Sequence, residues 1–336
     1  MHIRVAINGF GRIGRNTFKS GFGRLDAFDV VAINDLTDTK TLAHLLRHDT
    51  SYGLYEHEVS YDAQHIIVNG KKMRVYAEKD PAQLPWKKEK IDVVLECTGR
   101  FTDTESASAH IKAGAKRVII SAPAKDGTAP THVLGVNGED YDGKALVINN
   151  ASCTTNCISP VAAVMAEKFG VKKAMMTTIH GYTADQNLQD GPHKDLRRAR
   201  AAAANIVPTT TGAAIATTEV IPELKGLFDG LSMRVPVAVV SLSDFTFLLK
   251  KNVTVEQVNN ALKSASKQAR FHGVLACTEE ELVSSDLIKN PNSAIVDLGL
   301  TRVVDGDMVK VVAWYDNEWG YSSRLAEMAL VVGNAL

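Results

Sequence analysis

A cysteine at the expected start of a helix is the first residue of this chain that could carry chemistry. Cys153 follows a short apolar run that ends at Asn150, and residues 153–169 have a helical pattern. The positive end of a helix dipole favours a thiolate, the nucleophilic form of cysteine. His180 is the expected partner, because it ends a β-branched run before a loop, as suits a base with a fixed orientation.

A glycine pattern near the N-terminus predicts a second function. Gly9, Gly11 and Gly14 fit G-x-G-x-x-G, with a predicted strand before them and a predicted helix that opens within them. The three glycines would allow a tight turn, close approach to a pyrophosphate, and helix–strand packing. Asp35 ends the next predicted strand, where a carboxylate would bind ribose hydroxyls and repel a 2′-phosphate, which favours NAD over NADP. The alternative is a strand–helix turn without a ligand.

A dinucleotide site and a reactive cysteine in one chain indicate aldehyde oxidation through a thioester, with hydride transfer to a nicotinamide. The chain has 336 residues, enough for two domains, and its 38 basic and 38 acidic residues balance. A neutral chain has no strong field for nucleic acid or an anionic membrane, so neither is expected as a primary partner. No apolar run approaches the roughly 20 residues that span a bilayer.

The four cysteines lack the C-x-x-C spacing of zinc or redox sites, so we expect no metal. Four cysteines in a chain of this length do not form a disulfide framework, and no leader peptide is visible, which together favour the cytoplasm. Cys97 and Cys277 are expected to be buried thiols. Cys157, one helical turn after Cys153, is expected to pack in the core rather than to serve as a second nucleophile.

The first 150 residues alternate apolar runs with helical patterns, which predicts a parallel sheet covered on both faces. Strands are expected at 4–8, 30–34, 92–97, 117–121 and 146–149, and helices at 12–22, 39–47 and 105–113. Within the less regular segment 57–90, a hairpin is expected at 64–76 around Asn69-Gly70. The second half predicts a mixed or antiparallel sheet with helices on one face, from strands at 235–240, 243–249, 294–300 and 309–314 and helices at 255–267 and 324–332.

These patterns define an α/β chain with a Rossmann-type doubly wound parallel sheet and an α+β catalytic domain with a mixed or antiparallel sheet. The first domain is expected at residues 1–152, with a C-terminal helix at 318–336 packed back on it. The catalytic domain is expected at 153–317. It includes a long irregular loop at 181–211, and loops of this kind are usually functional or interfacial.

The motifs resemble those of the phosphorylating glyceraldehyde-3-phosphate dehydrogenase family from end to end. The matching segments are residues 6–15, 151–157, 180–183, 195–200, 234–236 and 314–321. Their order and spacing agree with the family, and the cysteine motif together with the Asp-Asn-Glu-Trp-Gly-Tyr run at 316–321 is highly specific. The resemblance implies NAD as cofactor, glyceraldehyde 3-phosphate and inorganic phosphate as substrates, and a homotetramer.

The resemblance also implies roles for individual residues. Cys153 would form a hemithioacetal with the aldehyde, and His180 would activate the thiol and then accept the hydroxyl proton as hydride leaves. Phosphate would release the thioester as 1,3-bisphosphoglycerate. The implied cofactor contacts are Gly9, Gly11, Arg12, Ile13, Gly14, Asn34, Asp35, Lys79, Ser121 and Asn317. The implied contacts to substrate or phosphate are Ser152, Thr154, Thr183, Arg198, Thr211, Gly212 and Arg234, and which arginine of the cluster at 197–200 points inward stays open.

Three alternatives are weighed against this interpretation. Erythrose-4-phosphate dehydrogenase has a similar scaffold, but residues 180–183 and 208–212 look like the glyceraldehyde enzyme. Aspartate-semialdehyde dehydrogenase shares a Cys–His pair, but Asp35 and the Arg234 motif argue against it. A non-catalytic NAD-binding protein would not need Cys153, His180 and Arg234 together. Departures from the family's usual residues at 232–233 and 237–244 are expected to affect packing or subunit contacts rather than the chemistry, whereas Gly191-Pro192 leaves the strictness of the NAD preference open.

Overall fold

The computed structural model describes residues 2–336, which form two compact units. Unit 1 comprises the chain up to His132, Asn137–Ser152 and Ser322–Leu336, and unit 2 comprises Val133–Val136 and Cys153–Tyr321. Met1, part of the first domain expected from the sequence, lies outside the described residues. Within the described chain, no helix is long and apolar enough to cross a membrane.

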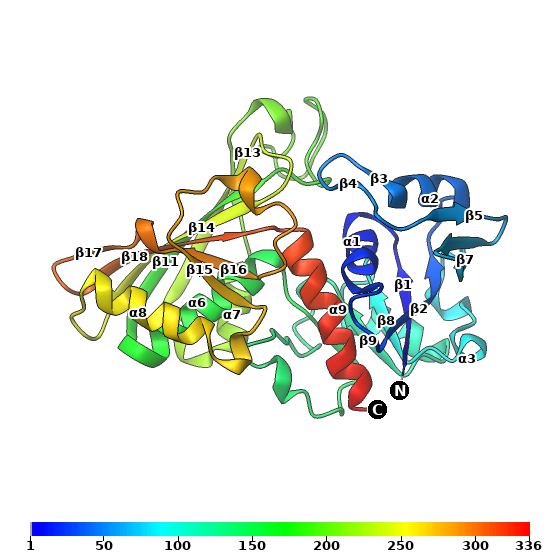
Figure 1. Ribbon diagram of the computed structural model, residues 1–336, viewed down its shortest axis with the longest axis horizontal. Coiled ribbons are helices and arrows are strands. Elements are labelled where there is room, and N and C mark those ends of the chain that lie inside the picture. Colours follow the sequence, from blue (N-terminus) through cyan, green and yellow to red (C-terminus); the bar gives the residue numbers. More distant parts are fainter. Residues whose placement is uncertain (1) are drawn as a thin grey trace. The chain divides into compact units, whose positions relative to one another are not determined.

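Unit 1 is built on an eight-stranded sheet with the strand order β10-β9-β8-β1-β2-β7-β6-β5 (Figure 1). Six neighbouring strands run parallel: β1 (Ile3–Asn8), β2 (Phe28–Asn34), β7 (Lys71–Tyr76), β8 (Val93–Glu96), β9 (Arg117–Ile120) and β10 (Val147–Asn149). The central residues Val5, Ile7 and Leu95 have no exposed surface. Their near-continuous apolar runs are typical of strands buried on both faces, as the sequence predicts.

The expected hairpin lies at the edge of this sheet. The strands β5 (Val59–Tyr61) and β6 (His65–Val68) pair antiparallel with each other, and β6 pairs antiparallel with β7. Asn69 and Gly70 both have positive φ, 47° and 78°, as a two-residue type I′ turn requires. A two-stranded ribbon of β3 (His48–Asp49) and β4 (Gly53–Leu54) precedes this hairpin.

The helices of unit 1 connect the parallel strands. They are α1 (Arg12–Gly21), α2 (Thr39–Arg47), α3 (Trp86–Glu89), α4 (Thr104–Ala107) and α5 (Ala109–Lys112). The helix expected at 105–113 is therefore interrupted at Ser108. Most of α9 (Trp319–Asn334) also belongs to this unit, where a Cβ on Gly333 would lie 2.5 Å from the Ile3 side chain of β1.

Unit 2 contains the predicted mixed sheet, with the order β12-β13-β11-β14-β18-β16-β15 and β17 paired to β18. Its strands are β11 (Val171–Gly181), β12 (Val207–Thr210), β13 (Phe228–Val235), β14 (Ser241–Leu249), β15 (Leu275–Thr278), β16 (Ala294–Asp297), β17 (Arg302–Val304) and β18 (Met308–Tyr315). The pairs β11–β13 and β15–β16 are parallel and the others antiparallel. The helices are α6 (Cys153–Phe169), α7 (Ala213–Val220) and α8 (Val255–Ser266), and α6 packs on both other helices and on the sheet (Figure 1).

Short 3-10 turns complete the two units: η1 (Pro81–Gln83), η2 (Gly138–Asp140), η3 (Ala202–Ala204), η4 (Pro222–Leu224), η5 (Ala269–Phe271), η6 (Ser284–Leu287) and η7 (Leu298–Leu300). The strand expected at 235–240 is wrong, because β13 ends at Val235. Pro236 follows and has no N–H for a strand ladder, and Val240 has a positive φ of 72°. The strand expected at 294–300 likewise stops at Asp297 and becomes a 3-10 turn.

Candidate active site

The glycine turn after β1 has two different structural requirements. Gly9 has a φ of 89°, and a Cβ there would lie 2.7 Å from the Thr98 nitrogen. A Cβ on Gly14 would lie 2.2 Å from the Gly9 carbonyl oxygen. A Cβ on Gly11 would meet nothing within 4 Å. Internal packing therefore requires Gly9 and Gly14, whereas Gly11 leaves open space at the start of α1, where a phosphate could approach the backbone.

A cavity of about 470 Å³ opens beside this turn. It is lined by Asn8, Gly9, Gly11, Asn34, Asp35, Leu36, Glu78, Lys79, Cys97, Thr98, Arg100 and Phe101. The Asp35 carboxylate accepts hydrogen bonds from the Phe10 nitrogen at 2.8 Å and the Thr37 nitrogen at 3.0 Å. The cavity suits a dinucleotide, because it combines the fixed Asp35 carboxylate, the cationic side chains of Lys79 and Arg100, and the start of α1.

The structure does not place every expected cofactor residue in this lining. Arg12 pairs with the buried carboxylate of Asp49 at 2.7 Å, and Ile13, Gly14 and Ser121 are not among the lining residues. Sequence reasoning missed Thr98 and Arg100, which follow β8 directly. The available signal was their position after a predicted strand, at the carboxyl edge of a parallel sheet.

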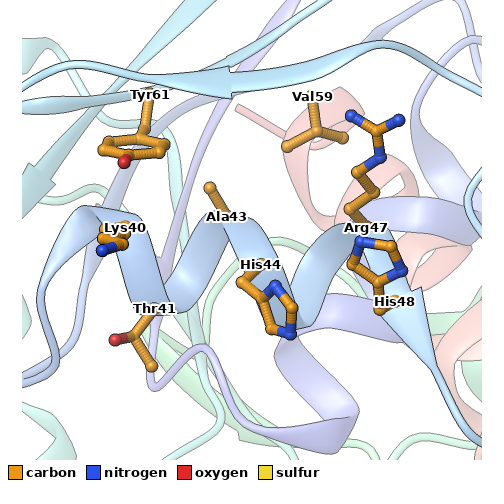
Figure 2. A pocket seen from close by; sticks show the side chains of 8 residues that line it. All are labelled: Lys40, Thr41, Ala43, His44, Arg47, His48, Val59 and Tyr61. Atoms are coloured by element: carbon orange, nitrogen blue, oxygen red, sulfur yellow. The ribbon is translucent and has the colours of Figure 1, made fainter.

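A second cavity in unit 1, of about 400 Å³, lies between α2 and β5. Figure 2 shows its lining, with Val59 and Tyr61 projecting from the strand over the helix: Lys40, Thr41, Ala43, His44, Arg47, His48, Val59 and Tyr61. None of these residues is a predicted site residue.

In unit 2, the expected cysteine and histidine meet. Cys153 is the first residue of α6, and its Sγ lies 3.5 Å from Nε2 of His180 at the end of β11. The His180 Nδ1 lies 2.6 Å from the Gly181 carbonyl oxygen, which can only accept. Nδ1 therefore carries the proton, and the lone pair of Nε2 faces the sulfur. Cys153 remains partly accessible, so a substrate can reach it.

The backbone before the cysteine has an unusual conformation. Ala151 has a φ of 53°, which costs a non-glycine residue roughly 1–2 kcal/mol. The Ala151 nitrogen donates to the Asn149 side-chain oxygen at 3.0 Å, and the Asn149 amide donates to the Ala129 carbonyl at 2.9 Å. This local hydrogen bonding turns the chain sharply between β10 and α6 and places Cys153 at the helix start.

The charges around the pair correct one expectation from the sequence. Burial raises the pKa of Cys153, and the Arg234 charge, the next largest influence, lowers it. Burial also lowers the pKa of His180, and Arg234 acts in the same direction. The expected thiolate with a depressed pKa is therefore not what this structure favours. Desolvation penalises both charged forms and so favours an uncharged thiol beside an uncharged imidazole in the ligand-free protein.

A buried hydroxyl network lies behind the thiol. The Tyr315 hydroxyl contacts the Thr154 hydroxyl at 2.9 Å and the Thr178 hydroxyl at 2.8 Å. Cys157 is fully buried, and burial raises its pKa. Cys157 therefore packs in the core. Tyr315 was missed as a site residue, although it lies inside the matched run at 314–321.

Cationic side chains approach the pair from neighbouring elements. Arg234 is opposite His180 in the parallel β11–β13 register, and its Nη1 donates to the Thr183 hydroxyl at 2.5 Å. The Arg198 Nε donates to the Thr209 hydroxyl at 3.0 Å. Asp185, which the sequence did not single out, pairs with Arg198 and lies 4.0 Å from Arg234. In the basic cluster, Arg198 is therefore turned toward Arg234.

The remaining expected residues have local partners. The Thr211 hydroxyl accepts from the Ala213 nitrogen at 3.2 Å, at the start of α7, and Gly212 precedes that helix. The Asn317 side-chain oxygen accepts from the Ser241 hydroxyl at 2.9 Å. Ser152 is the last residue of its segment of unit 1. Among the described residues, no group of three or more His, Cys, Asp or Glu side chains could hold a metal ion.

Two family models match the chain. The NAD binding domain of glyceraldehyde 3-phosphate dehydrogenase matches residues 3–104, and the C-terminal domain of the same enzyme matches residues 152–317. The chain is 52% identical to glyceraldehyde-3-phosphate dehydrogenase 2 of Streptomyces avermitilis over all of both chains. It is 53% identical to the glyceraldehyde-3-phosphate dehydrogenase of Geobacillus stearothermophilus over 99% of each chain, and 52% identical to that of Streptomyces coelicolor over all of both.

The two glycine environments predict opposite effects of adding a methyl group. Gly14→Ala should lower the free energy of unfolding by about 2 kcal/mol, because the clash with Gly9 is between backbone groups. Gly11→Ala should leave unfolding of the ligand-free protein unchanged and weaken NAD binding about tenfold, a loss of about 1.4 kcal/mol. Urea unfolding and calorimetric titration with NAD measure the two effects. Equal destabilisation by both substitutions would contradict the assignment.

The position of Arg234 predicts a pH-dependent change in thiol reactivity. Because Arg234 lowers the pKa of Cys153, Arg234→Gln should raise that pKa and reduce the thiolate fraction at neutral pH. Alkylation of the ligand-free protein by iodoacetamide should then be about fivefold slower near pH 7. The two rates should converge as the pH rises and both thiols ionise. Arg200→Gln is the control, since Arg200 pairs with Asp190 on the exposed surface. An unchanged or faster rate in Arg234→Gln would count against this role.

Proposed function

This chain belongs to the glyceraldehyde-3-phosphate dehydrogenase family, and we propose that it oxidises D-glyceraldehyde 3-phosphate with NAD and inorganic phosphate to 1,3-bisphosphoglycerate. The main support is the Sγ to Nε2 distance of 3.5 Å between Cys153 and His180. An oriented base beside a partly accessible thiol is the arrangement that covalent aldehyde oxidation needs. The reaction is part of glycolysis and gluconeogenesis.

Covalent capture starts from the uncharged pair. The His180 Nε2 accepts the Sγ proton while Sγ forms a bond to the aldehyde carbon, and the same proton then neutralises the new oxygen to give a hemithioacetal. Nε2 subsequently takes the hydroxyl proton as the carbon loses hydride, which leaves a thioester on Cys153. Bound NAD supplies the hydride acceptor. The Nδ1 bond to Gly181 keeps Nε2 aimed at the reacting atoms through both proton transfers.

Phosphate completes the reaction. A phosphate oxygen attacks the thioester carbon, the carbon–sulfur bond breaks, and Cys153 recovers its proton from His180. Arg234 with Thr183, and Arg198 with Thr209, offer hydrogen-bond donors for the two phosphate groups. Ser152, Thr154, Thr211 and Gly212 are proposed to assist at the incoming phosphate. The acyl phosphate product retains oxidation energy that hydrolysis of the thioester would lose.

The proposed cofactor site is the cavity beside the glycine turn. Asp35 would bind the ribose hydroxyls, and the start of α1 would face the pyrophosphate. Asn34 and Lys79 would contribute from the lining. Arg12, Ile13 and Ser121 are proposed to act near it, and Asn317 to orient the nicotinamide carboxamide.

We further propose a cytoplasmic homotetramer. All four cysteines are free thiols, which suits a reducing compartment. Large apolar side chains are exposed on unit 2, including Leu188 and Leu196 in the loop at 181–211 and Met175 on β11. Leu188 and Leu196 are more than 80% exposed, at 83% and 81%, which supports contact with another copy.

Phosphate dependence is the direct test of the proposed reaction. NADH formation from glyceraldehyde 3-phosphate should be sustained with inorganic phosphate, and without phosphate it should stop after about one turnover per site, because the thioester has no acceptor. The measurement is NADH absorbance in a stopped-flow instrument. Turnover with erythrose 4-phosphate but not with glyceraldehyde 3-phosphate would assign the chain to the related enzyme. NAD binding without turnover of either would support the non-catalytic alternative.

Substitution of the two neighbouring cysteines should separate chemistry from packing. Cys153→Ser should reduce kcat by at least about a thousandfold, since a hydroxyl is a much weaker nucleophile than a thiol. Cys157→Ser should retain most of the activity and lose about 1–2 kcal/mol of stability, because a hydroxyl costs more to bury than a thiol. Steady-state assays and thermal unfolding measure these effects. Comparable loss of kcat in both variants would exclude Cys153 as the sole essential thiol.

A further inference from the structure

A continuous chain of buried hydrogen bonds lies behind the cavity in unit 1. The Asn34 Nδ2 donates to the Asn8 side-chain oxygen at 2.7 Å, and the Asn8 Nδ2 donates to Oε2 of Glu96 at 2.5 Å. From the other side, the His110 Nε2 lies 3.1 Å from the same Glu96 oxygen, and the Trp86 indole nitrogen donates to the His110 Nδ1 at 2.9 Å. Glu96, His110 and Trp86 are at most 1% exposed.

The residues at the two ends of this series of hydrogen bonds determine which groups donate and which accept. The Glu78 backbone nitrogen donates to the Asn34 side-chain oxygen at 2.9 Å, so the Asn34 amide nitrogen must point to Asn8. At the other end, the indole of Trp86 can only donate, so Nδ1 of His110 must accept and Nε2 must carry the proton. The side chains of Asn8 and His110 therefore each have one possible orientation, and both donate to Glu96.

Glu96 also holds the backbone beside the glycine turn. Its second oxygen, Oε1, accepts from the Thr98 nitrogen at 2.8 Å and from the Thr98 hydroxyl. The Cys97–Thr98 peptide is the surface against which Gly9 packs, since a Cβ on Gly9 would lie 2.7 Å from the Thr98 nitrogen. The Cys97 nitrogen donates to the Asn8 carbonyl at 2.7 Å. One carboxylate thus accepts four hydrogen bonds, and two of its partners, Asn8 and Thr98, line the cavity.

Trp86, at the end of the hydrogen-bond series away from the cavity, is fixed in the hydrophobic core. Trp86 packs in the cluster that includes Leu84, Ile91, Val94 and Val118. A residue held in a packed core cannot move without disturbing its neighbours. The core therefore fixes Trp86, Trp86 orients His110, and His110 orients Glu96 beside the wall of the cavity.

We propose that Glu96, oriented by His110 and Trp86, is the positioning residue that holds the Asn8–Gly9 turn and the Cys97–Thr98 peptide in the shape that binds the dinucleotide. The proposal rests on the proposed use of this cavity for NAD. Glu96 acts through Asn8 and Thr98 and does not itself contact the ligand. The charge and acceptor character of residue 96 should therefore affect NAD affinity and leave the thiol chemistry of unit 2 unaffected.

The test substitution is Glu96→Gln, which keeps the shape of the side chain. The new amide group donates where four donors converge, so the turn must shift to separate them. Calorimetric titration should show NAD binding about tenfold weaker than in the wild type. The KM for NAD should rise by a similar factor, while the KM for the aldehyde and the alkylation rate of Cys153 stay unchanged.

Tyr141→Phe is the matched control for a general loss of stability. The Tyr141 hydroxyl bonds Arg117 at 2.9 Å and the Ala145 carbonyl at 2.7 Å, is buried in the same unit, and does not line the cavity. This control should lose thermal stability and keep its NAD affinity. An equal loss of NAD affinity in Tyr141→Phe and Glu96→Gln would overturn the positioning role.

A second pair of variants keeps the proposal testable if Glu96→Gln does not fold. His110→Gln retains a donor toward Glu96 and should bind NAD within about threefold of the wild type, whereas His110→Leu should bind about tenfold more weakly. Equal affinities of these two variants would overturn the proposal. Gly11→Ala, whose added Cβ would meet no atom within 4 Å, separates the positioning role from the cofactor site. If Gly11→Ala weakens NAD binding while Glu96→Gln binds normally, only the positioning role fails; if both variants bind normally, the proposed cofactor site fails as well.

Discussion

The contact between the Cys153 sulfur and the His180 imidazole is the interaction on which the chemistry of this protein depends. The two residues are 27 positions apart and come from different elements, α6 and β11. The left-handed conformation of Ala151 positions Cys153 at the start of α6, and the end of β11 positions His180 within hydrogen-bonding distance of it. Desolvation disfavours the charged form of each partner, so the resting pair is kept uncharged until a substrate binds.

Arg234 connects this pair to the phosphate chemistry. It is opposite His180 in the sheet register, it lowers the pKa of both members of the pair, and it donates to Thr183. Burial in turn lowers its own pKa. A single partly buried cation can therefore favour the thiolate when a substrate arrives and bind a phosphate oxygen at the same time. The Asp185 carboxylate between Arg234 and Arg198 balances these charges before a ligand binds.

Much of the fold could be predicted from the sequence, because parallel strands buried on both faces appear as apolar runs and the turn at Asn69-Gly70 has the residues that its conformation demands. All of β13 except its last residue, Val235, was missed, since Asp229, Gly230 and Ser232 weaken a strand pattern. The proximity of Cys153 and His180 could not be derived from spacing, because it depends on how α6 packs on the sheet. The direction of the Cys153 pKa shift was wrong for the same reason: a helix dipole can be inferred from sequence, but the desolvation of Cys153 depends on how α6 packs.

Trapping the covalent intermediate tests whether Cys153 carries the acyl group during turnover. The protein would be mixed with glyceraldehyde 3-phosphate and NAD without inorganic phosphate, quenched in acid, digested, and mapped by mass spectrometry. We expect a 3-phosphoglyceroyl group on the peptide that contains Cys153 and Cys157, located on Cys153 by fragmentation, and its disappearance when phosphate is added before the quench. An acyl group on Cys157, or NADH formation without any acylated cysteine, would contradict thioester formation on Cys153.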